Sequence, residues 1–211
     1  MSPEHHPRRT RESIYDMEIL CGECDGKLGL LDQHAAEHLL QRGPTGEIGI
    51  GSTAFGHFYK TAEAETLRMF VASVAWRASI SGHYFFRAVK LGRYEDVIRG
   101  ALLGKNDLGP IDVLLGEFDK DGVAILNPRR TRMDHVNFWV LYASKFIFYL
   151  KADQRACPAD LQTYKLQKGK DVAAVVRSWM ESKERPVIVK MAKRNANAFR
   201  RPTPSRDRSA A

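Results

Sequence analysis

The hydrophobic pattern changes period part-way along the chain, and this change is the feature that most constrains the fold. Over residues 61–81, apolar residues such as Leu67, Val71 and Ala78 recur at steps of three and four, which predicts an amphipathic helix. A second helix is predicted over residues 94–103. Beyond residue 110 the pattern becomes short runs rich in β-branched and aromatic residues, which are typical of strands.

The second half of the chain carries four such runs. They cover residues 111–118, 123–126, 136–142 and 146–150, and turn-forming residues join them in pairs. Helices that precede a group of antiparallel strands predict an α+β fold.

Four other segments complete the expected secondary structure. Residues 43–56 contain five glycines and are predicted to be loop, and residues 127–132 are predicted to be a basic loop. Asp32 is predicted to cap a helix over residues 33–41. Residues 170–182 show apolar positions at helical spacing and are predicted to be an amphipathic helix.

Charge is distributed unevenly along the 211 residues. Nine of the 33 Lys and Arg residues, against two of the 25 acidic residues, lie from Lys183 onward, so this end carries +7 of the net +8. We therefore expect three parts: a zinc-knuckle-like segment at 1–43, an α+β domain at 57–192 and a basic disordered tail at 193–211.

The composition argues against a membrane protein and against a secreted one. No run of about 18 apolar residues is present, and the first residues have no apolar core of a secretory signal. Three cysteines, two of them at CxxC spacing, fit a reducing compartment better than a disulfide framework. The expected location is the cytoplasm.

Cys21 and Cys24 form the motif with the clearest chemistry. Zinc takes four ligands, commonly thiolate and imidazole, and a CxxC turn supplies two of them. His34 and His38 would complete a C-x2-C-x9-H-x3-H pattern from one helix face, and His5 with His6 is the alternative pair. The alternative to a zinc site is a pair of unbridged thiols beside solvated histidines.

The residues around this motif resemble a known family. Glu4–Arg9 reads EHHPRR and Ile19–Asp25 reads ILCGECD, and together they resemble the second half of HNH nucleases, a treble-clef family. Residues 14–25 and 70–81 also resemble uncharacterised bacterial and phage proteins that are often labelled HNH-like.

The resemblance implies roles for particular residues. His6 or His5 would match the general base of the family, Asp25 would match a ligand of catalytic Mg²⁺ or Mn²⁺, and the CxxC would be half of a structural zinc site. The upstream CxxC of the family pattern is not found. We therefore expect an accessory protein that binds nucleic acid or protein, with a metal-dependent nuclease as the alternative.

Basic residues in two segments are candidates for contact with DNA or RNA phosphates. They are Arg129, Arg130, Arg132, Lys190, Lys193, Arg194, Arg200 and Arg201. A solvated turn and a solubilising tail are the simpler interpretations. A further possibility is a factor that works through a protein complex, such as an inhibitor of a host defence complex or a virion component.

Arg77 stands among apolar and small residues of the first predicted helix. A guanidinium in such a position requires a carboxylate partner, and Asp96 and Glu117 are the expected candidates.

Overall fold

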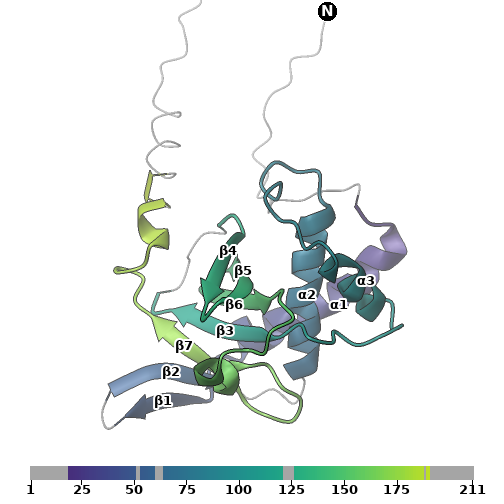
Figure 1. Ribbon diagram of the computed structural model, residues 1–211. Coiled ribbons are helices and arrows are strands. Elements are labelled where there is room, and N and C mark those ends of the chain that lie inside the picture. The colour runs from purple at the N-terminus through teal and green to yellow at the C-terminus, as the bar shows by residue number, and fades with distance from the viewer. Residues whose placement is uncertain (1–18, 51–52, 60–63, 121–125, 188, 191–211) are drawn as a thin grey trace, which may run out of the picture.

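The described part of the chain is a seven-strand sheet with the three α-helices gathered at one side (Figure 1). The computed structural model describes residues 19–50, 53–59, 64–120, 126–187 and 189–190. The helices are α1 (Gly22–Ala35), which continues as the π-helix η1 (Ala36–Gln41), α2 (Ala64–Ile80), α3 (Tyr94–Leu102) and the short 3₁₀ helix η2 (Ala159–Tyr164). Residues 184–187 form a further short helix near the C-terminal end. The strands are β1 (Gly46–Ile50), β2 (Thr53–Tyr59), β3 (Val113–Phe118), β4 (Arg129–Met133), β5 (Val136–Ala143), β6 (Phe146–Lys151) and β7 (Val172–Arg177).

The strand order is β1-β2-β7-β3-β6-β5-β4. All neighbouring strands are antiparallel except β7 and β3, which are parallel. The last strand of the described residues, β7, therefore lies between the β1–β2 hairpin and β3. The predicted α+β class is confirmed.

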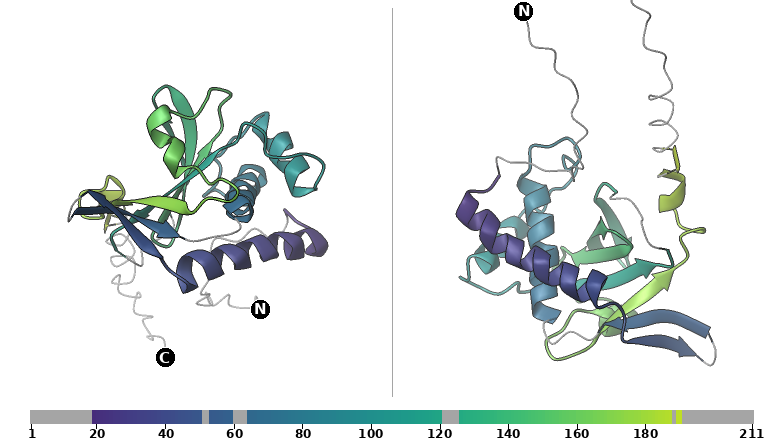
Figure 2. Two further views of the ribbon diagram at one scale, coloured as in Figure 1. Left: turned by 90° about the horizontal axis from the view of Figure 1, so that it is seen from below. Right: turned by 180° about the vertical axis from the view of Figure 1, so that it is seen from behind.

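The main core forms where the helices meet the sheet. Leu67 and Val71 of α2 are fully buried there with Leu115 of β3 and Phe148 of β6. α1 crosses α2 on the outer side (Figure 2) and contributes Ala35 to the same core.

An ion pair fixes the crossing of α1 and α2. The guanidinium of Arg77 donates two hydrogen bonds to Asp32, of 2.9 Å and 2.6 Å. The predicted partners of Arg77, Asp96 and Glu117, were wrong, and Asp32 does not cap a helix because α1 begins ten residues earlier. A bidentate Arg–carboxylate pair is both strong and directional, so it sets the angle between the helices.

Long apolar patterns gave correct predictions. The helices predicted over 61–81 and 94–103 correspond to α2 and α3, and the strand over 111–118 to β3. The two runs at 136–142 and 146–150 are β5 and β6. Residues 121–125, which hold most of the other predicted strand, lie outside the described residues, and residue 126 is not in a strand.

Three predictions were wrong, and each missed a strand. Residues 43–56 contribute β1 and part of β2, residues 127–132 contribute most of β4, and the helix predicted over 170–182 is β7. Val172, Ala173 and Ala174 are consecutive and all buried, as expected of a strand covered on both faces. Such a run, with further valines behind it, also satisfies helical spacing.

None of the helices in the described part of the chain is long and apolar enough to cross a membrane.

The contact between β2 and β7 can be tested with one glycine. A Cβ atom on Gly56 would lie 2.6 Å from the carbonyl oxygen of Ala174, whereas a Cβ on Gly46 would meet nothing within 4 Å. We expect Gly56→Ala to lower the free energy of unfolding by about 1–3 kcal/mol, the usual cost of overpacking. Urea unfolding of this variant and of the matched control Gly46→Ala measures the difference; equal stability of the two would contradict the β2–β7 pairing.

Candidate functional site

The CxxC motif forms the beginning of α1. Cys21 is the N-cap residue and Cys24 lies in the first turn, and neither is in a disulfide. The pKa of the Cys21 thiol is lowered because it accepts hydrogen bonds from the Cys24 backbone and side chain, and the pKa of Cys24 is raised by the same side-chain contact. Cys21 is exposed and Cys24 half-buried, so both sulfurs remain accessible to a metal or an electrophile.

The structure does not bring His34 and His38 to the two cysteines. Both histidines lie near the other end of the same helix, and at 1.5 Å per residue Cys24 and His34 are about 15 Å apart along the axis. Their rings stack on each other, with centroids 4.1 Å apart, so the predicted shared face is present.

The other predicted ligands are distributed as follows. Asp25 is exposed in the first turn of α1, where its backbone N–H donates to the Cys21 carbonyl at 2.9 Å. His5 and His6 lie outside the described residues. Within the described ranges, no group of three or more His, Cys, Asp or Glu residues could hold a metal ion.

The three arginines of β4 have different surroundings. Arg129 donates to the Tyr142 hydroxyl at 3.0 Å and to the buried Glu184 carboxylate at 2.9 Å, so it anchors the C-terminal segment to the sheet. Arg130 lies over the ring of Trp139, 5.7 Å from its centroid. Arg132 is 3.4 Å from the Asn137 amide oxygen.

A second basic segment was missed by the sequence analysis. The loop between α2 and α3 carries Arg87, Lys90 and Arg93, all exposed, together with Tyr84, which is 74% exposed. The Tyr84 ring packs on His83 with centroids 4.5 Å apart, so it is held in place at the surface. The interleaving of aromatic and basic residues over 83–93 was the signal in the sequence.

A hydrogen bond ties this loop to the beginning of β4. The side-chain amide of Asn127 donates to the Phe85 carbonyl at 3.0 Å, two residues before Arg129. We call the exposed residues on the two segments the basic rim: Arg87, Lys90, Arg93, Arg130 and Arg132, with Tyr84. Within the part of the chain that the structure describes, none of these five cations pairs with a carboxylate.

The remaining candidates for phosphate contact belong to the C-terminal end. Lys190 is exposed. Lys193, Arg194, Arg200 and Arg201 lie outside the described residues.

A buried carboxylate forms a second cluster of reactive groups. Glu117 of β3 has an exposed fraction of 1%, and its Oε2 atom accepts a 2.6 Å hydrogen bond from the Tyr59 hydroxyl. Nδ1 of His57 is hydrogen-bonded to Oε1 of Glu117, and Nζ of Lys145 lies 3.3 Å from Oε2. We call these four residues the Glu117 cluster.

The strand order makes this cluster possible. His57 and Tyr59 lie on β2 and Glu117 on β3, with β7 between them. The β7 residue paired with His57 is Ala174, whose methyl group leaves room for longer side chains to meet above the strand. Misreading β7 as a helix therefore also concealed the cluster.

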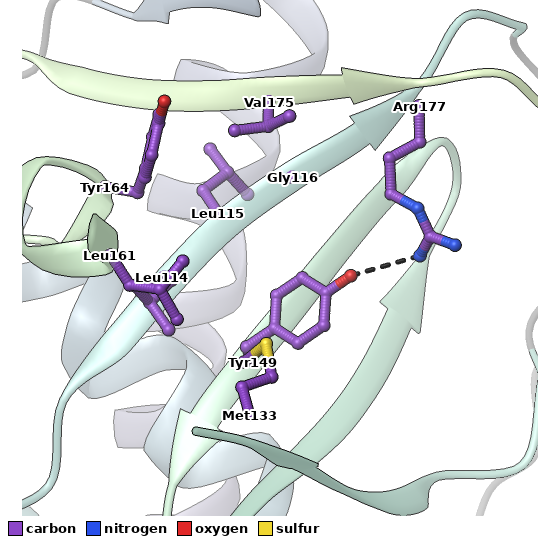
Figure 3. Close-up of a pocket in the computed structure, with 9 residues that line it drawn as sticks. All are labelled: Leu114, Leu115, Gly116, Met133, Tyr149, Leu161, Tyr164, Val175 and Arg177. Carbon is purple, nitrogen blue, oxygen red and sulfur yellow. Dashed lines mark hydrogen bonds between the residues drawn. The ribbon is translucent and has the colours of Figure 1, made fainter. Parts of the chain in front are cut away.

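An apolar pocket of about 180 Å³ lies elsewhere on the sheet (Figure 3). Leu114 and Gly116 of β3, Met133 of β4 and Leu161 of η2 are among its lining residues. Two of its polar side chains contact each other, because Arg177 donates to the Tyr149 hydroxyl at 3.1 Å; Arg177 also lies 3.7 Å from Glu184. The pocket can accommodate a small apolar group.

No family model, curated protein or solved structure matches the chain. Its function therefore has to be argued from the basic rim, the CxxC motif and the Glu117 cluster.

Proposed function

We propose that this protein is a nucleic-acid-binding accessory protein of the cytoplasm whose contact surface is the basic rim. The observation that carries the proposal is the group of five exposed cations beside Tyr84, none paired with a carboxylate among the described residues. The Asn127–Phe85 hydrogen bond joins the two segments, and the described residues give neither of them a carboxylate partner for these cations.

The chemistry of the rim matches a phosphate backbone. Guanidinium groups donate to phosphate oxygens in a fixed planar geometry, and neutralising phosphates releases condensed counterions. Tyr84 offers an exposed ring on which an unpaired base can stack. A single-stranded nucleic acid is therefore the expected ligand class, and the basic residues from Lys190 onward would add non-specific attraction.

The CxxC motif supports a related proposal about ancestry. Two accessible thiols at a helix start, one with a lowered pKa, are suited to hold zinc. The two further ligands would come from His5 and His6, since His34 and His38 lie too far along α1. The motif would then be a structural remnant of an HNH-like site.

Two alternative functions can each be tested by a separate experiment. A metal-dependent nuclease would use His6 and Asp25 with Mg²⁺ or Mn²⁺, and His6→Ala would abolish its activity. A factor acting on a protein complex would retain its partner after nuclease treatment of a host lysate.

Removing rim arginines should weaken binding and its salt dependence together. We expect Arg130→Ala/Arg132→Ala to lower affinity for a single-stranded oligonucleotide and to reduce the slope of log K against log salt by about 1.4, or about 0.7 for each lost phosphate contact. Fluorescence anisotropy titrations between 50 mM and 200 mM salt measure both quantities.

The matched control is Lys168→Ala/Lys170→Ala, which removes two exposed cations from the loop before β7. A chain ending at Lys190 separates the tail from the rim, because it retains Glu184 and the contact of Glu184 with Arg129. Equal slopes for the two double variants would overturn the assignment of the rim.

Zinc content tests the second proposal. We expect the purified full chain to contain about one equivalent of zinc, and Cys21→Ser/Cys24→Ser and His5→Ala/His6→Ala to lose it. His34→Ala/His38→Ala should retain the metal, because these side chains lie at the far end of α1. Elemental analysis decides the matter; a folded, metal-free wild-type protein would exclude a zinc site.

A further inference from the structure

The Glu117 cluster is a group of acid–base side chains to which the proposed function assigns no role. A carboxylate with 1% exposure is costly to keep ionised unless it receives several hydrogen bonds, and here three side chains supply contacts. Two of them remain open to solvent, since His57 is 28% and Lys145 22% exposed. Substrate can therefore reach the groups that surround the carboxylate.

The orientation of His57 is that of a general base. Nδ1 contacts Oε1 of Glu117, and a carboxylate can only accept, so in this contact Nδ1 carries the proton and Nε2 is the nitrogen left to accept one. The carboxylate fixes this tautomer and stabilises the imidazolium that forms when Nε2 takes up a proton. Tyr59 is buried and its hydroxyl donates to Oε2 of Glu117, so it is a positioning residue that orients the carboxylate.

Lys145 adds a positive charge to the same place. Its ammonium lies 3.3 Å from Glu117 and remains partly exposed, so it can also approach an anionic substrate. A base beside a cation suits reactions in which negative charge develops on a phosphate. The contacts described for the cluster include no serine, threonine or cysteine side chain that could act as nucleophile.

We infer that His57, Glu117 and Lys145 form an acid–base site that cleaves RNA by transesterification. The inference rests on the proposed binding function, which brings an RNA strand to the protein. RNA carries its own nucleophile, the 2′-hydroxyl next to each phosphorus, and so needs only a base and a charge stabiliser.

The bonds and protons balance without a further reactant. Nε2 of His57 removes the proton of the 2′-hydroxyl, the 2′ oxygen forms a bond to phosphorus, and the bond from phosphorus to the 5′ oxygen breaks. Lys145 stabilises the charge on the phosphoryl oxygens, the leaving 5′ oxygen takes a proton from water, and His57 returns its proton to the solvent. The products are a 2′,3′-cyclic phosphate and a 5′-hydroxyl end.

The test uses the full chain, a labelled single-stranded RNA and buffer containing EDTA. His57→Asn is the informative variant, because asparagine retains an N–H group near the position of Nδ1 for Glu117 and removes Nε2. Its matched control is His135→Asn, at an exposed turn position with φ 64°, which asparagine tolerates. We expect His57→Asn to slow cleavage by about 10²- to 10⁴-fold, the usual contribution of a general base, and His135→Asn to leave it unchanged.

A second substrate separates chemistry from binding. RNA with a single ribonucleotide in an otherwise deoxy strand should be cut only after that residue, and the all-deoxy strand should bind without being cut. Binding without cleavage by the wild-type protein, or equal cleavage by His57→Asn, overturns this inference. Neither result would affect the proposed binding role of the basic rim. Loss of binding itself, with no effect of rim substitutions, overturns the proposed function.

Discussion

The carboxylate of Glu117 is the constraint on which the arrangement of the sheet depends. An ionised group with so little exposure must find donors inside the protein, and the nearest strand, β7, offers only small and branched apolar side chains at this point. The donors come instead from β2 and from the turn before β6. The carboxylate therefore joins strands that are not neighbours, across β7, whose residue paired with His57 is an alanine.

The basic rim and the Glu117 cluster lie in different regions of the molecule. The basic rim lies on the α2–α3 loop and on β4, the strand at one end of the sheet order, whereas the Glu117 cluster lies over β2, β7 and β3. All three arginines of β4 are exposed, but Arg129 is paired with Glu184, whereas Arg130 and Arg132 have no carboxylate partner among the described residues. Binding and chemistry would thus depend on different residues and can be altered separately.

The local sequence pattern was sufficient to predict the helices with one apolar face and the strands rich in aromatic and branched residues. α2 and α3 repeat apolar residues at helical spacing, and β5 and β6 are dense in aromatic and branched residues. β1 and β4 were missed because they are rich in glycine and arginine respectively, and the first part of β2 was missed with the glycine-rich segment that precedes it. Pairing with neighbouring strands outweighs local propensity in all three. β7 was missed because a strand buried on both faces loses the alternation that would distinguish it from a helix.

The site was less predictable than the fold for a related reason. Cys21 and Cys24 were recognisable because their ligand spacing is local, yet the helix that follows carries His34 and His38 away from them. Glu117, His57 and Lys145 are separated by up to 88 positions, and only the strand order brings them together. A single acid inside an apolar strand was the available signal, and it gave no indication of its partners.

NMR of the imidazole nitrogens measures the contact between His57 and Glu117 directly. In the wild-type protein, long-range ¹H–¹⁵N correlations should show a proton on Nδ1 of His57, and Glu117→Gln should shift that nitrogen signal while leaving those of His135 unchanged. A His57 spectrum with the proton on Nε2 alone, or one that is insensitive to Glu117→Gln, would show that Glu117 does not orient the His57 ring.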